Sequence, residues 1–286
     1  MSNRNLPTFL VIGAAKCGTT SLAAYLASHP QIGMAKPKEL NFFSFHWDRG
    51  IDSYQQRFAG MEASIRGEAS PSYTRAPLIE NVPERIASVI PDVRLVYLIR
   101  HPIDRIRSEY LHRVHHGKER VSTLAEAIST NPRYLIVSKY GYQLDQYLSY
   151  FAPSQLLVLT TERLMSDRVQ AVQEVLAFVG ADGSLLPQNL DQELNRGDEK
   201  QRIPRVLDPL RTVWRSARPV TGRIPSKWRH GLRSQLGRQI DPDATNLTQE
   251  QEDRIWTELK PDLTRLREIV GPEMSLWTTN QTNKPA

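Results

Sequence analysis

The sequence predicts a three-layer α/β protein in which a central, mostly parallel sheet is covered by helices. Three short apolar runs, at 9–12, 93–99 and 155–160, indicate buried strands, and each leads into a segment with helical periodicity. The run at 93–99 is almost continuously apolar, which is typical of a parallel strand covered on both faces. The alternation of strands and helices therefore favours a parallel sheet with helices on each side.

The composition fits a soluble globular protein and excludes the disordered and collagen-like classes. The 286 residues are 40% hydrophobic and 24% charged, which is ample for a buried core. A net charge of +6 indicates an anionic ligand or surface without choosing among nucleotide, nucleic acid, glycan and membrane. No apolar run approaches the roughly 18 residues of a membrane span, and no secretory leader pattern is present. We therefore expect a cytoplasmic protein.

The segment FLVIGAAKCGTTSLAAYL predicts a strand, a phosphate-binding loop and a helix in direct succession. Gly13 and Gly18 have the spacing of a phosphate loop, and the hydroxyls of Thr19, Thr20 and Ser21 follow at the start of the helix. Unpaired backbone N–H groups and the positive end of the helix dipole attract an anion at such a point. An ordinary strand-to-helix turn is the simpler alternative, but it leaves the run of hydroxyls unexplained.

The lysine of this loop is not at the position that nucleoside triphosphatases use. Their lysine follows the second glycine, whereas here Thr19 follows Gly18 and the lysine lies inside the loop, as Lys16. A lysine there lies beside the reactive end of a bound anion. The single cysteine, Cys17, excludes intrachain disulfides and fits a reducing compartment. It is either a nucleophile activated by the helix N-terminus or, as we favour, a small residue that fills the loop.

Two segments supply acidic candidates for the site. Glu39 lies in a polar loop, KPKELNFF, whose aromatic pair is expected to pack into the core and hold the end of the loop. A carboxylate held in this way is a candidate general base, and a solvated loop glutamate is the ordinary alternative. Glu68 and Ser70, in a short strand predicted over 66–70, are candidates to face a ligand.

A second candidate anion site follows the strand at 93–99. Ligands of open α/β sheets bind beyond the carboxyl ends of the strands, so Arg100 is placed to face the same ligand as the phosphate loop. Ser108 lies on the next helix, which is expected to begin near Pro102. An arginine together with a helix hydroxyl suits a second phosphate. The alternative for Arg100 is a surface ion pair with Asp104.

Other elements are expected around this core. Helices are predicted over 47–63 and 134–150, and a capping box at Thr248 predicts a tail of two helices split by Pro261. The histidines of 112–116 have helical spacing but no cysteine or acidic partners, so no metal site is expected.

Residues 195–245 differ in composition from the rest of the chain. Arginines recur there among prolines, with Trp214 and Trp228 beside Arg215 and Arg229. The segment is the best candidate for a lid or an acceptor-facing subregion. A basic helical cover with solvated arginines is the simpler interpretation, and peripheral contact with an anionic membrane or glycan is the alternative.

Four motifs in chain order resemble those of the sulfotransferases that use 3′-phosphoadenylyl sulfate (PAPS): FLVIGAAKCGTTSL, KPKELNFFS, GEASPSY and VYLIRHPIDRIRSEY. The sequence is similar to the bacterial members and to the heparan sulfate N- and 3-O-sulfotransferase branch. The resemblance implies one domain of the P-loop type over 1–286, with a cofactor-binding core at 7–180, the basic subregion at 195–245 and carboxyl-terminal helices at 246–279. It also implies PAPS as co-substrate, adenosine 3′,5′-bisphosphate (PAP) as product, and no metal.

The resemblance also assigns the site residues by position. It places the 5′-phosphosulfate at Lys16, Cys17, Gly18, Thr19, Thr20 and Ser21, the 3′-phosphate at Arg100 and Ser108, and a late basic cofactor loop at Lys200 and Arg202. Glu39 matches the catalytic base, and Lys16 would stabilise the leaving group. Two departures from the family pattern, Ala69 for a lysine and Asn41 for a histidine, affect the acceptor pocket more than the cofactor site.

The reaction implied is in-line transfer of a sulfuryl group to a hydroxyl, which needs positioning and cationic stabilisation more than a metal. The expected acceptor is a glycan or glycolipid, followed by a lipid or another small molecule. No nucleic-acid-binding module is recognisable. The rival interpretations are a P-loop kinase or NTPase, for which Thr19 and Arg100 are the wrong residues at their positions, and a non-catalytic nucleotide-binding protein.

Overall fold

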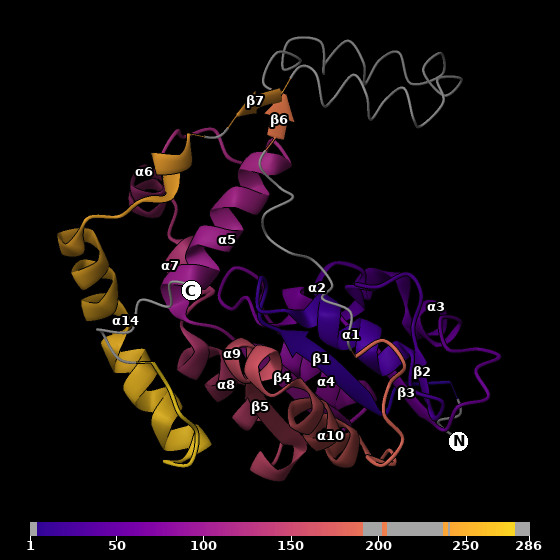
Figure 1. Cartoon of the computed structure of the whole chain (residues 1–286). Helices are drawn as coiled ribbons and strands as arrows, with labels where there is room; N and C mark the ends of the chain where they lie inside the picture. The colour runs from indigo at the N-terminus through magenta and orange to yellow at the C-terminus, as the bar shows by residue number, and fades with distance from the viewer. Residues whose placement is uncertain (1–4, 191–201, 205–236, 240, 278–286) are drawn as a thin grey trace, which may run out of the picture.

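A five-stranded parallel sheet forms the centre of the computed structural model, which describes residues 5–190, 202–204, 237–239 and 241–277 (Figure 1). The strand order is β2-β3-β1-β4-β5, and every neighbouring pair is parallel. The strands are β1 (Phe9–Gly13), β2 (Ile32–Met34), β3 (Ile65–Ala69), β4 (Arg94–Ile99) and β5 (Leu156–Thr160). The α/β class predicted from the sequence is confirmed.

Helices cover both faces of this sheet. The α-helices of the described ranges, of which α6, α7 and α14 pack mainly on other helices, are α1 (Thr19–Ala27), α2 (Phe42–Phe45), α3 (Ile51–Gln55), α4 (Val82–Val89), α5 (Pro102–His115), α6 (Leu124–Thr130), α7 (Arg133–Ile136), α8 (Tyr140–Leu148), α9 (Thr161–Ser166), α10 (Arg168–Val179) and α14 (Gln249–Val270). Gly18, at the start of α1, lies against the Leu98 side chain, whereas the ring of Tyr97 contacts Tyr140 of α8 with centroids 6.1 Å apart. Because successive strand residues point to opposite faces, α1 and α8 lie on opposite sides of β4.

The two central strands are buried along their length, as their apolar sequences predicted. All five residues of β1 and residues 95–99 of β4 are buried, with Val11 opposite Val96 in the parallel register. Strand β2 was not expected from the sequence. It has only three residues, one of them Gly33, and so shows neither alternation nor a long apolar run.

Two predicted helices are shorter than expected. The stretch at 47–63 contains a 3₁₀ turn, Trp47–Arg49, and then α3, because Gly50 between them has a φ of 75°. The stretch at 134–150 is divided into α7 and α8, which are separated at Ser138. Ser138 is fully buried, and its hydroxyl accepts a hydrogen bond from Nε of Arg105 at 2.6 Å.

The predicted break of the tail at Pro261 is wrong, because α14 continues through this residue. Pro261 is exposed, so water can hydrogen-bond the backbone carbonyl that the proline leaves without a partner. The opposite face of α14 buries a continuous stripe that includes Ile255, Leu259 and Leu263, and the helix packs along α8 (Figure 1). Burial of this stripe outweighs the local cost of the proline. The capping box of Thr248 and Gln251 is confirmed.

A short antiparallel ribbon lies apart from the main sheet. Strand β6 (Arg202–Pro204) pairs with β7 (Gly237–Gln239), and β6 lies beside α5 (Figure 1). Most of the basic segment 195–245, with the predicted lid and membrane contact, lies outside the described residues. None of the helices in the described ranges has the length and apolarity needed to cross a membrane.

Candidate functional site

The candidate residues lie where the central strands end. Strand β1 lies between β3 and β4, so the residues that follow Gly13, Ala69 and Ile99 emerge side by side at the carboxyl edge of the sheet. The phosphate loop follows β1 and Arg100 follows β4. The loop of Glu39 reaches the same edge, because the Glu39 N–H donates to the carbonyl of Ala69 at 3.2 Å. The structure thus brings together three of the segments that the sequence singled out.

The phosphate loop presents unpaired backbone donors at the start of α1. Gly18 occupies the N-cap position with a φ of 83°, and no side chain caps the helix. Across the described part of the chain, the backbone N–H groups of Thr19 and Thr20 have no protein acceptor. Lys16 adopts a φ of 74°, a strained conformation for a residue other than glycine, which is common at functional sites. The loop therefore offers N–H groups and a helix N-terminus to an anion.

Cys17 fills the inside of this loop, where its surroundings disfavour the reactive thiolate. Its side chain is fully buried, with Sγ 4.0 Å from the Tyr140 hydroxyl. Burial raises the pKa of the Cys17 thiol to about 12, and the nearby cations Arg105 and Arg100 oppose this shift only in part. The thiolate is therefore not populated at neutral pH, which agrees with the filling role favoured from the sequence.

Labelling of Cys17 by a small thiol reagent is expected to be negligible in the folded protein at pH 8. The reagent needs both access and a thiolate, and burial removes both. The measurement is the number of labelled thiols per chain in buffer and in denaturant. Full labelling in denaturant, where one thiol is available, is the control. Stoichiometric labelling without denaturant would contradict the assignment.

The loop that carries Glu39 is fixed by its neighbours, while its carboxylate remains exposed. Asn41 Nδ2 donates to the Glu39 carbonyl at 2.9 Å, and Ser72 Oγ donates to Asn41 Oδ1 at 2.6 Å. Glu39 and Asn41 both have positive φ, at 65° and 52°. The Glu39 side chain is 50% exposed, and its Oε1 lies 2.8 Å from Nζ of Lys38. The aromatic pair Phe42–Phe43 is buried, as predicted, and anchors the end of the loop.

Glu68 does not face a ligand, contrary to the expectation from the sequence. Its carboxylate is 1% exposed and accepts hydrogen bonds from the hydroxyls of Tyr54, Tyr73 and Ser70 at 3.0, 2.6 and 3.3 Å. Burial raises the pKa of Glu68 to about 7, although the three hydroxyl donors oppose the shift. Ser70 is also fully buried. Glu68 is therefore part of the packing beneath the Glu39 loop.

The stability of the protein is expected to fall by up to about 3 kcal/mol between pH 4.5 and 7 because of Glu68. Its pKa is higher in the folded state, about 7, than the ordinary 4.5, so folding favours the protonated form. This stability is present below pH 4.5 and is lost as the pH rises through 7. Urea unfolding at pH 5 and 7.5 tests this: Glu68→Gln should remove most of the difference. An equal fall in the free energy of unfolding between these pH values in the wild-type protein and in Glu68→Gln would contradict the prediction.

The turn after β4 is tied to the phosphate loop and to α9. The Tyr140 hydroxyl donates to the Arg100 carbonyl at 2.7 Å, and Glu162 Oε1 accepts from the His101 N–H at 2.8 Å. The Thr161 hydroxyl lies 2.8 Å from the carbonyl of Cys17 and 3.0 Å from that of Ile99. These three side chains, which the sequence did not single out, fix the backbone on either side of the candidate anion site.

The alternative ion pair between Arg100 and Asp104 does not form. Asp104 instead lies 3.5 Å from Arg107 and 3.8 Å from the His101 ring. Within the described ranges, the Arg100 guanidinium makes no ion pair, and it is partly exposed at the edge of the sheet. Its charge is therefore available to a ligand. Ser108 lies in the second turn of α5 and is also partly exposed.

The residue next to Arg100 is enclosed by the carboxyl-terminal part of the chain. The ring of His101 is 3% exposed and lies edge-on to Trp256 of α14 and to Trp277, with ring centroids 5.3 and 6.1 Å apart. Burial lowers the pKa of His101, so the ring is held neutral. The tail of the chain thus packs directly behind the Arg100 turn.

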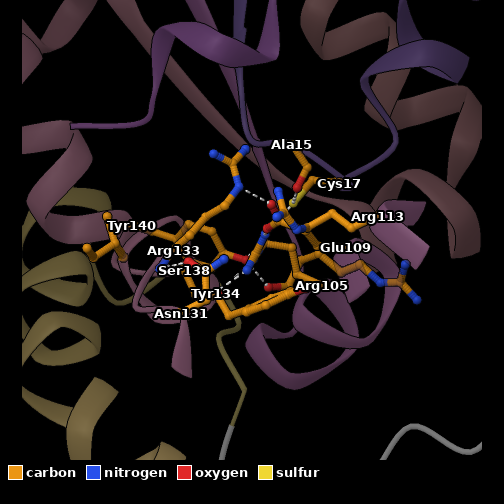
Figure 2. Close-up of polar contacts among 12 residues, drawn as sticks. Ala15, Cys17, Arg105, Glu109, Arg113, Asn131, Arg133, Tyr134, Ser138 and Tyr140 are labelled. Carbon is orange, nitrogen blue, oxygen red and sulfur yellow. Dashed lines mark hydrogen bonds and ion pairs between the residues drawn. The ribbon is translucent and has the colours of Figure 1, made fainter. Parts of the chain in front are cut away.

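A buried ionic network lies below the phosphate loop and was not predicted. Arg105, which is 0% exposed, contacts Glu109 Oε2 at 2.5 Å, and Arg133 Nε lies 2.6 Å from Glu109 Oε1 (Figure 2). Arg105 also donates to the carbonyl of Tyr134 and to the hydroxyl of Ser138. The two guanidiniums hold the pKa of Glu109 at about 2, well below its ordinary range. Both oxygens of this carboxylate are therefore engaged.

The remaining predicted residues are only partly covered by the structure. Lys200 lies outside the described residues, and Arg202 is placed only through the backbone of β6, where it pairs with Gln239. In the described ranges, no cluster of three histidine, cysteine or acidic residues could hold a metal ion. The rings of His112 and His116 lie close together at the end of α5, with centroids 4.1 Å apart and the ring planes tilted by 39°.

Known proteins are similar in sequence to about three-fifths of this chain. The chain is 32% identical over 197 residues to human bifunctional heparan sulfate N-deacetylase/N-sulfotransferase 3, in a match that covers 61% of the chain and 22% of the relative. It is 30% identical over 192 residues to mouse heparan sulfate glucosamine 3-O-sulfotransferase 6, covering 62% of the chain and 53% of that relative. The chain thus spans only part of the length of either relative.

Solved structures share the fold. The crystal structure of a sulfotransferase from Alicyclobacillus acidocaldarius superposes with a TM-score of 0.67 at 24% identity, covering 94% of this chain and 97% of the other. Mouse sulfotransferase SULT7A1, in complex with PAP, superposes with a TM-score of 0.51 at 15% identity, covering 94% and 85%. A family model described as the sulfotransferase domain matches residues 6–202, which include the phosphate loop, the Glu39 loop and the Arg100 turn. The chain therefore belongs to the sulfotransferase family, as its four motifs indicated.

Proposed function

We propose that this protein transfers the sulfuryl group of PAPS to a hydroxyl of a carbohydrate. The observation that carries the proposal is the pair of anion sites at the ends of neighbouring strands: the uncapped start of α1 after β1, and Arg100 after β4. PAPS has a phosphosulfate at one end of its ribose and a phosphate on the 3′ position. Two separate anion sites at one sheet edge suit such a ligand better than they suit a nucleotide with a single triphosphate chain.

In this proposal the loop residues Lys16–Ser21 bind the 5′-phosphosulfate through backbone N–H groups, hydroxyls and the Lys16 ammonium. Arg100 and Ser108 bind the 3′-phosphate. Arg202 contributes from β6 together with Lys200, and the position of β6 beside α5, the helix of Ser108, is consistent with that role. The donors are cationic, hydroxyl and backbone N–H groups, which suit phosphate and sulfate.

Glu39 acts as the general base in this mechanism. Its carboxylate is exposed at the sheet edge while its backbone is fixed, so it can meet an incoming hydroxyl without a loop movement. The ion pair with Lys38 must open, or rotate aside, when the acceptor binds. Lys16 stabilises the charge that develops on the bridging oxygen as PAP leaves. PAPS supplies the activated sulfuryl group, and the protein supplies position, base and positive charge.

The proposed acceptor is a sugar, because the related mouse and human proteins are by name heparan sulfate sulfotransferases. The human relative is by name an N-sulfotransferase, and the mouse 3-O-sulfotransferase is the one whose name supports a hydroxyl. A glycolipid acceptor and peripheral membrane contact are the narrower forms of this proposal, and they depend on the segment 195–245. A cytoplasmic location is also proposed, because the single cysteine fits a reducing compartment.

The test is calorimetric titration with PAP in the absence of metal, beside ATP with magnesium. PAP is expected to bind, and Arg100→Ala should weaken its affinity about 10- to 100-fold, because a charge-assisted contact to phosphate contributes about 1.5 to 3 kcal/mol. The exposed Arg254, which pairs with Glu250 on α14, provides a matched control in Arg254→Ala. If ATP with magnesium bound and PAP did not, the kinase interpretation would replace this one.

A further inference from the structure

The peptide bond between Arg100 and His101 is held at both of its polar groups. The hydroxyl of Tyr140 donates to its carbonyl at 2.7 Å, and Oε1 of Glu162 accepts from its N–H at 2.8 Å. Because the two groups belong to one planar unit and point in opposite directions, the two hydrogen bonds together fix the orientation of that plane. The orientation of the plane sets ψ of Arg100, and with it the direction in which the Arg100 side chain leaves the backbone.

The Tyr140 side chain is enclosed and is not accessible to a ligand. It is 0% exposed, and its ring lies near the rings of Tyr97 and Trp277, with centroids 6.1 Å apart in each case. Its hydroxyl also lies 4.0 Å from Sγ of Cys17. Because packing fixes the ring, the hydroxyl is presented to the Arg100 carbonyl at one place. Tyr140 can therefore act on a bound anion only through the groups of the protein that it touches.

The carboxyl-terminal helix α14 caps the start of α8, where Tyr140 is the first residue. Both carboxylate oxygens of Asp262 accept from backbone N–H groups there, Oδ2 from Gly141 at 3.0 Å and Oδ1 from Tyr142 at 2.7 Å. These N–H groups are among those that the start of a helix leaves without an intrahelical partner. The negative charge also complements the helix dipole. Asp262 is thus an N-terminal cap supplied by a helix that is remote in sequence.

The backbones of α8 and α14 come into contact at this cap. A Cβ on Gly141 would lie 2.6 Å from the carbonyl oxygen of Asp262 and 2.9 Å from the nitrogen of Leu266, so a larger residue does not fit. A second contact between the same helices, the exposed ion pair of Arg265 with Asp145 at 2.8 Å, lies one turn further along α8. The cap therefore fixes the end of α8 that carries Tyr140, and the ion pair provides an internal comparison.

We infer that Tyr140 is a positioning residue for the 3′-phosphate of the nucleotide, acting through Arg100, and that Asp262 holds Tyr140 in place. The inference rests on the proposed function and deepens it. A bidentate contact between arginine and phosphate depends on the plane of the guanidinium, and such a site has to be held to within about 0.5 Å by supporting hydrogen bonds. Without the hydroxyl of Tyr140 the Arg100 peptide can rotate, and the guanidinium then adopts orientations that miss the phosphate.

The test is a double-mutant cycle on PAP affinity, measured by calorimetry without metal. Tyr140→Phe keeps the buried ring and removes only the hydroxyl, and it is expected to weaken PAP binding about 3- to 10-fold, as the loss of one hydrogen bond does. In the Arg100→Ala background the same change should cost less than about twofold, because the group that Tyr140 positions is gone. Tyr147→Phe is the matched control, since this equally buried hydroxyl on α8 donates to the carbonyl of Tyr73 at 2.9 Å. It should leave PAP affinity within about twofold.

A second arm of the experiment tests the cap. Asp262→Ala is expected to weaken PAP binding about 3-fold or more, again only in the presence of Arg100. Asp262→Asn, which keeps one of the two accepting oxygens, should lose less. Asp145→Ala removes the exposed ion pair between the same two helices and should keep PAP affinity within about twofold. The unfolding temperature of each variant shows that it is folded.

Other results would overturn the inference. Equal losses from Tyr140→Phe with and without Arg100 would show a structural role, and so would a loss of the same size in Tyr147→Phe or Asp145→Ala. Unchanged PAP affinity in Tyr140→Phe or in Asp262→Ala would remove that residue from the assignment. The titration of the wild-type protein keeps the two proposals apart: failure of PAP to bind rejects the proposed function and this inference with it, whereas PAP binding without the coupling to Arg100 rejects only the inference.

Discussion

Replacing Glu39 by glutamine is expected to lower the rate of sulfuryl transfer by about 10²- to 10⁴-fold, the range that a general base contributes. Glutamine keeps the size and the hydrogen-bonding oxygen of the side chain but cannot accept the acceptor's proton. The loop should keep its shape, because the contacts that fix it come from the backbone of Glu39 and from Asn41. The dissociation constant of PAP should therefore remain within about twofold of the wild-type value.

The measurement combines turnover with PAP binding in the same preparations. Glu62→Gln is a matched control, since Glu62 is an exposed glutamate on the connection before β3 and should tolerate the same change. If Glu39→Gln kept more than a tenth of the wild-type turnover, the base would lie elsewhere. If it lost PAP affinity as well, Glu39 would be acting on the loop structure rather than on the acceptor.

Replacing Glu109 by alanine is expected to destabilise the fold by about 3 to 5 kcal/mol, the usual cost of leaving a buried charge without its partner. Arg105 is 0% exposed and would keep only its contacts to Ser138 and to the carbonyl of Tyr134. Urea unfolding measures the change. Glu250→Ala is the matched control, because it breaks an arginine–glutamate pair with the same i,i+4 spacing whose side chains are 77% and 74% exposed. We expect this control to cost less than about 1 kcal/mol.

The same network predicts a loss of stability in acid. The pKa of Glu109 is about 2 in the folded protein against an ordinary 4.5, so its contribution of about 3 kcal/mol is present above pH 4.5 and is lost as the pH falls toward 2. Glu109→Gln should lower the free energy of unfolding at neutral pH and flatten the acid limb of its plot against pH. An acid limb of unchanged slope in Glu109→Gln would show that other carboxylates dominate.

The elements that could be predicted from the sequence are those with a recognisable local sequence pattern. Strand β4 is a long apolar run and the phosphate loop has its glycine spacing, and both lie where expected. The choice of Arg100 as a candidate followed from the rule that ligands bind at the carboxyl ends of parallel strands. The continuity of α14 through Pro261 could not be predicted, because it depends on packing against α8, which is remote in sequence.

The parts of the site that were missed depend on which side of an element becomes buried. Arg105 and Glu109 lie four residues apart on α5, a spacing that usually indicates an exposed ion pair. The packing of α6 and α7 against α5 contributes to their burial. Glu68 was misjudged for the same reason, since the Tyr54 hydroxyl that helps to enclose it comes from α3, and the hydroxyls of Ser70 and Tyr73 turn inward after β3.

The enclosure of His101 by Trp256 and Trp277 bears on the order in which the protein matures during synthesis. The sheet, the phosphate loop and Arg100 are all encoded in the first two-thirds of the chain, and domains fold as they emerge from the ribosome. The rings that pack behind the Arg100 turn are made after these elements. A nascent chain can therefore form the sheet and the Arg100 turn while the back of this turn is still open. The turn is enclosed, and the core completed, only when Trp277 has left the exit tunnel.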